Sequence, residues 1–163
     1  MDSGALVMDG DVIQPETVVR LARDDDLLDV WMLIMQLGAE FPETEINKAK
    51  ILEFIQHIKE HGFLIVVEYG DKIVGTSAVL PQQWWFSDGW YLEDYWTYLS
   101  EEGRRFGVAK ALFKKLKELS DRTKMPLILG VLTLKQVERK NILFRRFFTP
   151  IGERFAYNLF PEG

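Results

Sequence analysis

Hydrophobic residues recur along this chain with a period that switches between that of a helix and that of a strand. Ile51, Ile55 and Ile58 lie at helical spacing, whereas 63–69 is an unbroken run rich in β-branched and aromatic residues. The Gly70-Asp71 pair that follows is typical of a two-residue hairpin turn. In order, the chain predicts a strand at 17–23, a helix from the carboxylates of Asp24, Asp25 and Asp26 to Leu37, a helix from Thr44 to His61, strands at 63–69, 72–80 and 90–99, a helix that opens in 101–109 and reaches Leu119, a strand at 127–133, a helix at 137–147 and a strand at 153–160.

This order of elements, β-α-α-β-β-β-α-β-α-β, predicts an α/β (α+β) fold in which helices flank a mixed, mostly antiparallel central sheet. Residues 1–16 hold four acids, no bases and Pro15, so we expect an N-terminal extension with little structure. A length of 163 residues suits one domain, which is predicted to span residues 17–163.

The composition excludes several classes of site. The chain has no cysteine, which removes disulfides, thiolate metal sites and cysteine nucleophiles. Its two histidines, His57 and His61, lie four residues apart without further ligands nearby, so we expect surface residues and no metal site. Apolar runs are far shorter than the ~20 residues of a membrane span, and residues 1–10 lack the pattern of a secretory signal. A soluble cytoplasmic protein is therefore expected.

Positive charge is concentrated in one stretch of an acidic chain. Residues 103–146 hold 13 Lys and Arg but 3 Asp and Glu, a local charge of +10, so the remainder carries −15. The basic stretch suits a small anionic ligand and the acidic remainder a cationic one, whereas segregation that merely serves solubility is the alternative. A net charge of −5 argues against nucleic acid as a partner.

The junction between the strand at 90–99 and the next helix carries the most informative motif. Arg104-x-x-Gly107-x-Ala109 runs from a loop directly into the helix, with Arg105 and Lys110 adding positive charge. Such a junction directs free backbone N–H groups at one point, and small residues let a phosphate approach the backbone. The motif alone is weak, because a glycine before a helix is more often an ordinary turn.

Together with its context, this loop resembles the Gln/Arg-x-x-Gly-x-Gly/Ala loop of the GNAT N-acetyltransferase superfamily. The order of elements is also similar to that family, and Asn141 with Ile151-Gly152 partly matches its C-terminal Asn…Leu-Tyr-x-x-Leu-Gly-Phe segment. The resemblance covers residues 17–160. It implies an N-acyltransferase that uses acetyl-CoA as cosubstrate and an amine-bearing acceptor.

The resemblance also implies roles for individual residues. The main chain of Leu99, five residues before the loop arginine, would pair with the pantetheine arm, and Asn141 would meet that arm from the following helix. Arg105, Lys110, Arg139 and Lys140 are candidates for the 3′-phosphate. The backbone N–H groups that would hold the pyrophosphate are those of Arg104, Arg105, Phe106, Gly107, Val108 and Ala109.

Acyl transfer to an amine needs a base for the ammonium proton. Glu93 lies six residues before Leu99, which by strand alternation predicts the same face of the sheet, and its position resembles that of the glutamate base in histone-acetyltransferase-like members. A solvated strand carboxylate is the equal alternative. Asp94 would point to the opposite face and is the weaker candidate.

The sequence departs from the family pattern near its end. Phe148 stands where a tyrosine commonly protonates the leaving thiolate, and a phenyl ring has no proton to give. Tyr98 and Tyr157 are candidate substitutes, and Pro150 is expected to end the preceding helix early. These departures put catalysis in more doubt than cofactor binding.

Aromatic residues cluster just before the motif, where 8 of the 15 residues from Trp84 to Tyr98 carry rings. Such rings can hold a cationic amine or stack on a planar group, and core packing with a homo-oligomer interface is the alternative. Three hypotheses therefore remain open. They are an N-acetyltransferase acting on a primary amine, a catalytically degenerate GNAT fold that binds CoA or serves as a structural module, and a nucleobase-modifying GNAT.

Overall fold

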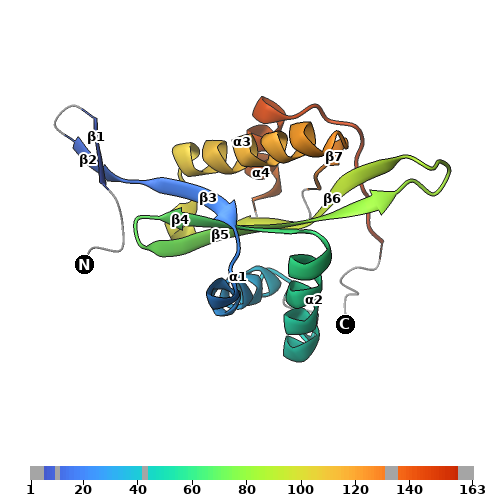
Figure 1. Cartoon of the computed structure of the whole chain (residues 1–163), viewed down its shortest axis with the longest axis horizontal. Coiled ribbons are helices and arrows are strands. Elements are labelled where there is room, and N and C mark those ends of the chain that lie inside the picture. Colours follow the sequence, from blue (N-terminus) through green and yellow to red (C-terminus); the bar gives the residue numbers. More distant parts are fainter. Residues whose placement is uncertain (1–5, 10–11, 42–43, 131–135, 158–163) are drawn as a thin grey trace.

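A computed structural model of the chain describes residues 6–9, 12–41, 44–130 and 136–157. Its centre is a five-stranded sheet in which neighbouring strands follow the chain order, β3-β4-β5-β6-β7 (Figure 1). The first four strands pair antiparallel and β6 pairs parallel with β7, which confirms the mixed, mostly antiparallel sheet. The strands are β3 (Thr17–Leu21), β4 (Phe63–Tyr69), β5 (Lys72–Gln83), β6 (Trp90–Leu99) and β7 (Leu127–Ile128).

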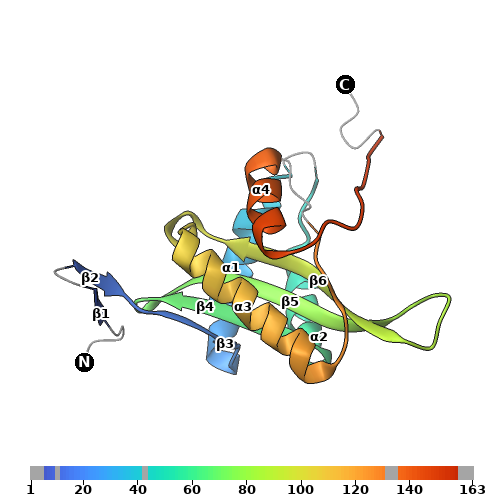
Figure 2. The same ribbon diagram turned by 90° about the horizontal axis from the view of Figure 1, so that it is seen from above.

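Two helices cover each face of the sheet, α1 and α2 on one side and α3 and α4 on the other (Figures 1 and 2). We call these the α1/α2 face and the α3/α4 face. Asn47 caps α2, because its side-chain oxygen accepts a hydrogen bond from Lys50 N at 3.0 Å. The helices are α1 (Leu27–Gly38), α2 (Lys48–His61), α3 (Phe106–Thr123) and α4 (Val137–Phe147), with short 3-10 turns at Asp24–Asp26 and Glu101–Gly103.

The position of β4 between the two layers of helices explains why its sequence is one continuous apolar run. Ile65 and Val67 pack with α3 on one face, while Leu64 and Val66 pack with α1 and α2 on the other. A strand covered on both faces has no solvent-facing side to carry polar residues. The sheet therefore separates two cores and supports both layers of helices.

An ion network ties α1 to the sheet. Arg20 on β3 contacts the carboxylate of Asp26 at 2.7 Å and that of Glu68 at 2.6 Å. Asp26 also accepts a hydrogen bond from Arg23 N, at 2.7 Å, before α1 begins. The hydrogen bonds from Arg20 lower the pKa of Asp26 below its ordinary value, so this carboxylate is ionised where it fixes the start of α1.

A β-bulge interrupts β6 in its middle. Asp94 pairs with Val79 and Trp96 pairs with Ala78, so Tyr95 is the extra residue between two neighbouring partners. An extra residue shifts the alternation of side chains by one position. Glu93 therefore lies on the α1/α2 face, the same face as its cross-strand partner Leu80. Leu99 packs on the α3/α4 face. The prediction that Glu93 and Leu99 share a face is wrong for this reason.

The β5–β6 hairpin extends beyond the rest of the sheet. β4 begins at Phe63, paired with Val79, so the residues from Leu80 to Gln83 pair only with β6. We call the segment from Leu80 to Glu93 the arm, and both ribbon views show it projecting past the helices (Figures 1 and 2). At its turn, Trp85 is 93% exposed.

Three predictions about the ends of the fold need correction. The N-terminal extension is not structureless, because β1 (Leu6–Asp9) and β2 (Val12–Pro15) pair as an antiparallel hairpin. The strand predicted at 127–133 is a strand only at Leu127–Ile128, and residues 131–133 lie outside the described part. Residues 153–157 of the predicted last strand form no strand and pair with none of the described strands, and 158–160 lie outside the description.

Candidate active site

Free backbone N–H groups gather where the 3-10 turn after β6 leads into α3. The helical hydrogen bonds begin with Ala109 N, which donates to Arg105 O at 3.0 Å. Because an α-helix leaves its first N–H groups without an internal acceptor, those of Phe106, Gly107 and Val108 are available to a ligand. Arg104 and Arg105 differ from that expectation, since their N–H groups donate to Glu101 O and Gly103 O.

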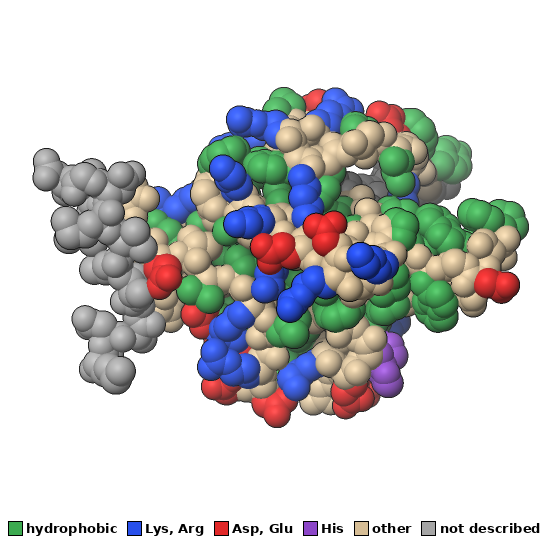
Figure 3. Space-filling view, turned by 45° about the horizontal axis from the view of Figure 1, so that its top comes forward, with side chains coloured by type: hydrophobic (Ala, Val, Ile, Leu, Met, Phe, Trp, Pro, Cys, Tyr) green, Lys and Arg blue, Asp and Glu red, His purple; other side chains and the backbone are tan. Residues whose placement is uncertain are grey.

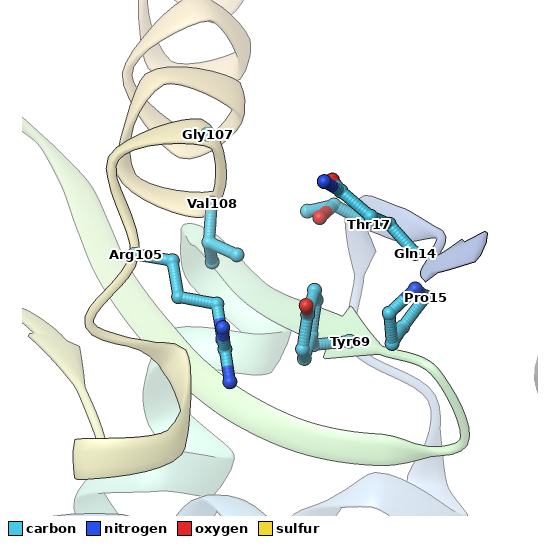
Figure 4. Close-up of a pocket in the computed structure, with 7 residues that line it drawn as sticks. All are labelled: Gln14, Pro15, Thr17, Tyr69, Arg105, Gly107 and Val108. Carbon is cyan, nitrogen blue, oxygen red and sulfur yellow. The ribbon is translucent and has the colours of Figure 1, made fainter. Parts of the chain in front are cut away.

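Gly107 opens this helix end to a pocket of about 510 Å³ (Figure 4). A Cβ atom built at Gly107 would meet nothing within 4 Å, so a ligand can approach the backbone there. Arg105 lines the pocket with its guanidinium 4.9 Å from the ring centroid of Tyr69, a cation–π contact that holds positive charge at the opening. The other lining residues are Gln14, Pro15, Thr17 and Val108.

Arg104 braces the loop against β6. Its Nε donates to the carbonyl oxygen of Leu99 at 3.0 Å, and its guanidinium lies 5.7 Å from the ring centroid of Tyr98. The Leu99 carbonyl therefore has a protein partner already. Tyr98 is buried, and this burial raises the pKa of its phenol.

β6 and β7 separate after a short parallel pairing. The last paired residues are Glu93 and Ile128, and beyond them the Asp94 carboxylate accepts a hydrogen bond from Gly130 N at 2.9 Å. A second bond comes from the hydroxyl of Thr97, also at 2.9 Å. Among the described residues, the edge of β6 that faces away from β5 has no strand partner beyond this point.

Burial raises the pKa of Asp94 to about 6, while its bonds to Gly130 and Thr97 oppose that shift. Glu93 lies on the other face of the sheet with its side chain 31% exposed. Its carboxylate accepts from the Tyr91 hydroxyl at 3.4 Å and stands 4.0 Å from the Arg154 guanidinium. A half-exposed carboxylate next to an open strand edge is placed to exchange a proton with an incoming group.

Helix α4 joins this region through aromatic rings. Phe148 follows α4 and packs against Phe113 of α3, with ring centroids 5.2 Å apart, and Lys117 lies 5.1 Å from its ring centroid. Phe148 is thus part of the contact between two helices. Asn141 is half-buried on α4, and Lys140 on the same helix contacts Glu40 at 3.4 Å.

Most of the basic residues expected at the site are exposed around α3 and α4. Lys110 and Arg139 are exposed, and Lys and Arg side chains spread over this side of the molecule (Figure 3). The two histidines are also exposed, with ring centroids 4.7 Å apart. Within the described part of the chain, no group of three or more His, Cys, Asp or Glu residues could hold a metal ion. No described helix has the length and apolar character that crossing a bilayer requires.

Sequence reasoning missed part of this site. Gln14 at the end of the N-terminal hairpin and Thr17 at the start of β3 line the same pocket as Arg105 and Gly107, and no sequence motif indicates that they do. Asp94 was expected on the face opposite Leu99, as the weaker candidate base, and this prediction is wrong: Asp94 pairs with Val79 and lies on the α3/α4 face with Leu99. Its bond to Gly130 marks where β6 and β7 separate. The bulge at Tyr95 is hidden in the sequence by the aromatic residues around it.

Comparison with known proteins agrees with this geometry. A sequence model of the acetyltransferase (GNAT) family matches residues 28–140, whereas no curated protein matches the chain by sequence. A possible acetyltransferase from Clostridium difficile 630 superposes with a TM-score of 0.67 at 19% identity, covering 87% of this chain and 97% of that one. An aminoglycoside 6′-N-acetyltransferase from Acinetobacter haemolyticus gives 0.67 at 14% identity, covering 86% and 95%. A GNAT family acetyltransferase from Staphylococcus aureus gives 0.62 at 18%, covering 87% and 98%.

The family match spans more than half of the chain and includes the loop, the free N–H groups of α3 and the strands that diverge beside them. The structural neighbours share the same arrangement of sheet and helices over nearly their whole length. The chain belongs to the GNAT acetyltransferase family.

Proposed function

We propose that this protein transfers an acetyl group from acetyl-CoA to a primary amine by direct attack. The observation that carries the proposal is the end of α3, where three free N–H groups and an open Gly107 face a pocket lined by Arg105. These features fit the pyrophosphate of acetyl-CoA, because amides at a helix N-terminus and a nearby guanidinium both favour a bound anion.

The pantetheine arm would follow the free edge of β6. Leu99 and the residues before it lie on that edge, and Asn141 would meet the arm from α4. Because the Leu99 carbonyl accepts from Arg104, we expect the arm to pair with other main-chain groups of β6, or to displace that arginine. Lys110, Arg139 and Lys140 are candidates for the 3′-phosphate.

Glu93 is the proposed base. It would take the proton from the ammonium group of the acceptor, either directly or through one water, so that the neutral amine can attack the thioester carbonyl carbon. As the new N–C bond forms and the C–S bond breaks, the nitrogen loses its second proton to solvent. The CoA thiolate takes up a proton and leaves, so one net proton is released. Glu93 stands at the last residue pair before β7 leaves β6, on the face where the carboxylate is partly open to solvent.

The same fold serving only as a CoA-binding module is the second candidate. It is favoured by Phe148, whose ring packs on Phe113 and offers no proton for the thiolate. Of the two candidate substitutes, Tyr98 is buried with its ring 5.7 Å from the Arg104 guanidinium, and Tyr157 is 91% exposed. In the acetyltransferase this proton would then come from water.

The two candidates are separated by CoA release from acetyl-CoA in the presence of a panel of primary amines. The acetyltransferase predicts release above the background rate and a loss of ~10²–10⁴-fold in kcat for Glu93→Gln, which is the usual contribution of a general base. Glu102→Gln, an exposed acid of the 3-10 turn before the loop, is the matched control and should leave kcat unchanged.

Binding of acetyl-CoA without turnover of any amine would favour the module. Full activity in Glu93→Gln would remove Glu93 from the mechanism and leave the acetyltransferase itself in place. Absence of acetyl-CoA binding would contradict both candidates.

A further inference from the structure

The α1/α2 face of the arm carries rings and one carboxylate in a row. Pairing of Leu80 with Glu93 and of Gln82 with Tyr91 places these residues on the same face. Trp84 stacks on Tyr91 with ring centroids 4.1 Å apart and the planes 25° from parallel. The Tyr91 hydroxyl then reaches the Glu93 carboxylate at 3.4 Å. Rings and acid thus form one continuous surface.

These side chains have a fixed spacing. Tyr91 and Glu93 are two residues apart on one strand before the bulge, so their side chains leave the backbone ~7 Å from each other. Trp84 and Tyr91 are both half-buried, which leaves part of each ring open to solvent. Beside them, Gln82 donates to the Tyr95 hydroxyl at 2.9 Å, and Tyr95 packs edge-on against Phe54 of α2. These contacts tie the arm next to the row to helix α2.

A cation already stands next to the carboxylate. The Arg154 guanidinium lies 4.0 Å from Glu93, although its side chain is 88% exposed and belongs to a segment without secondary structure. Contacts of this length and exposure contribute little free energy. An ammonium group that reaches Glu93 can therefore replace Arg154 with little loss of free energy.

We propose that the acceptor is a monoamine carried on a flat aromatic ring, with the ring against Trp84 and Tyr91 and the ammonium group at Glu93. This inference rests on the proposed function and names the substrate class of the same site. A ring separated from its amine by two carbons spans the distance between the two parts of the row. Ring–ring and cation–π contacts would add to the ion pair.

Polycationic acceptors fit this surface less well. Glu93 is the one carboxylate among the residues that the strands of the arm place on this face, Leu80, Gln82, Tyr91 and Glu93. Every further ammonium group of a polyamine or an aminoglycoside would lose hydration there without finding an acid. What this face offers beside Glu93 is instead the stacked rings of Trp84 and Tyr91.

The test compares 2-phenylethylamine and tryptamine with spermidine and kanamycin, first as substrates with acetyl-CoA and then as ligands of the CoA-bound protein by calorimetry. We expect the two aromatic amines to have the highest kcat/KM and the tightest binding. Trp84→Ala should raise KM for 2-phenylethylamine about tenfold, equal to about 1.4 kcal/mol, with little change in kcat. Trp85→Ala, which removes an exposed ring of the turn, is the matched control and should leave KM unchanged.

Better use or tighter binding of spermidine or kanamycin would overturn the inference while leaving amine acetylation in place. An unchanged KM in Trp84→Ala would overturn it as well. If no amine is acetylated, the proposed function fails, and the calorimetric order of the four amines still decides the nature of the binding surface.

Discussion

The body of the molecule, formed by β3 to β6 with α1 to α3, differs sharply in packing from the C-terminal region formed by α4 and residues 148–157. Helix α3 buries Val108, Ala109, Leu112, Phe113 and Leu116, whereas α4 has no fully buried residue. Residues 151–157 are exposed throughout, including Phe155 at 88%. Ring contacts such as Phe113 with Phe144, 5.0 Å apart, hold α4 to the body.

This contrast shows where the fold leaves room for substrates. The body has two closed cores, so its elements are fixed by their own side chains. The C-terminal region contacts Glu93 through the exposed Arg154, whose guanidinium lies 4.0 Å away. Regions with few buried contacts open at low free energy. We therefore expect the two substrates to enter beside the less packed part.

The largest effect is expected from breaking the body. Leu116→Ala removes a side chain that is 0% exposed, which should lower the free energy of unfolding by ~2–5 kcal/mol. Ile142→Ala on α4, where the side chain is 60% exposed, should lower it by less than about 0.5 kcal/mol. Urea denaturation measures both. Equal losses would mean that α4 is packed as tightly as α3.

An opposite effect is expected at Asp94, a buried carboxyl of the body. Asp94→Asn should raise the free energy of unfolding at pH 7 by ~1–3 kcal/mol, because burial penalises the charged carboxylate and the amide has no charge to bury. Glu93→Gln is the control on the exposed face and should change the stability little. If Asp94→Asn is less stable, the free energy that the charged carboxylate gains from its bonds to Gly130 and Thr97 exceeds the cost of burying its charge.

The pH dependence of the same carboxyl has a definite sign. Its pKa is raised from 3.8 to about 6 by folding, so the folded state holds the proton more tightly than the unfolded state. This contribution to the free energy of unfolding is fully present below pH ~4 and is lost as the pH rises to ~6. Above pH ~6 the carboxyl no longer changes the stability with pH. Melting temperatures of the wild type and Asp94→Asn across this range measure it, and parallel curves would contradict the shift.

The smallest effect is expected from restoring a hydroxyl in the C-terminal region. Phe148→Tyr should change kcat by less than about threefold, far below the 10²–10⁴ of a working general acid. The reason is that this ring packs against Phe113 and Lys117 between two helices. CoA release measures the rate. A gain of a hundredfold would place position 148 at the leaving sulfur and sharpen the resemblance to tyrosine-bearing members of the family.

Sequence patterns predicted the body well, because local signals and packing agree there. The strands at 63–69 and 90–99 of the body have the predicted bounds. The helix at 137–147 has them too, although it belongs to the C-terminal region. Helix α3 starts at Phe106, after a 3-10 turn at Glu101–Gly103 that its helix-favouring acids do not reveal. Strand propensity alone failed for 153–157, since a strand exists only where another strand pairs with it.

The site was predicted in part. The loop motif located the free N–H groups, because a helix end needs only the local sequence. The relation of Glu93 to Leu99 was wrong, since one extra residue at Tyr95 reverses every side chain beyond it. Relations between distant segments, such as Thr17 and Arg105 lining one pocket or the bond of Gly130 to Asp94, depend on tertiary structure and leave no pattern in the chain.

The most direct test is calorimetry with acetyl-CoA on the wild type, Gly107→Glu and Lys114→Glu. Gly107 lies within α3 and does not have a positive φ, so its backbone conformation is compatible with a glutamate. The new side chain would add a carboxylate where the pyrophosphate should lie. Lys114→Glu makes the same kind of charge change on an exposed position of the same helix. We predict micromolar or tighter binding by the wild type, a loss of roughly a hundredfold or more in Gly107→Glu, and a much smaller change in Lys114→Glu. Equal affinity in the wild type and Gly107→Glu would contradict the account.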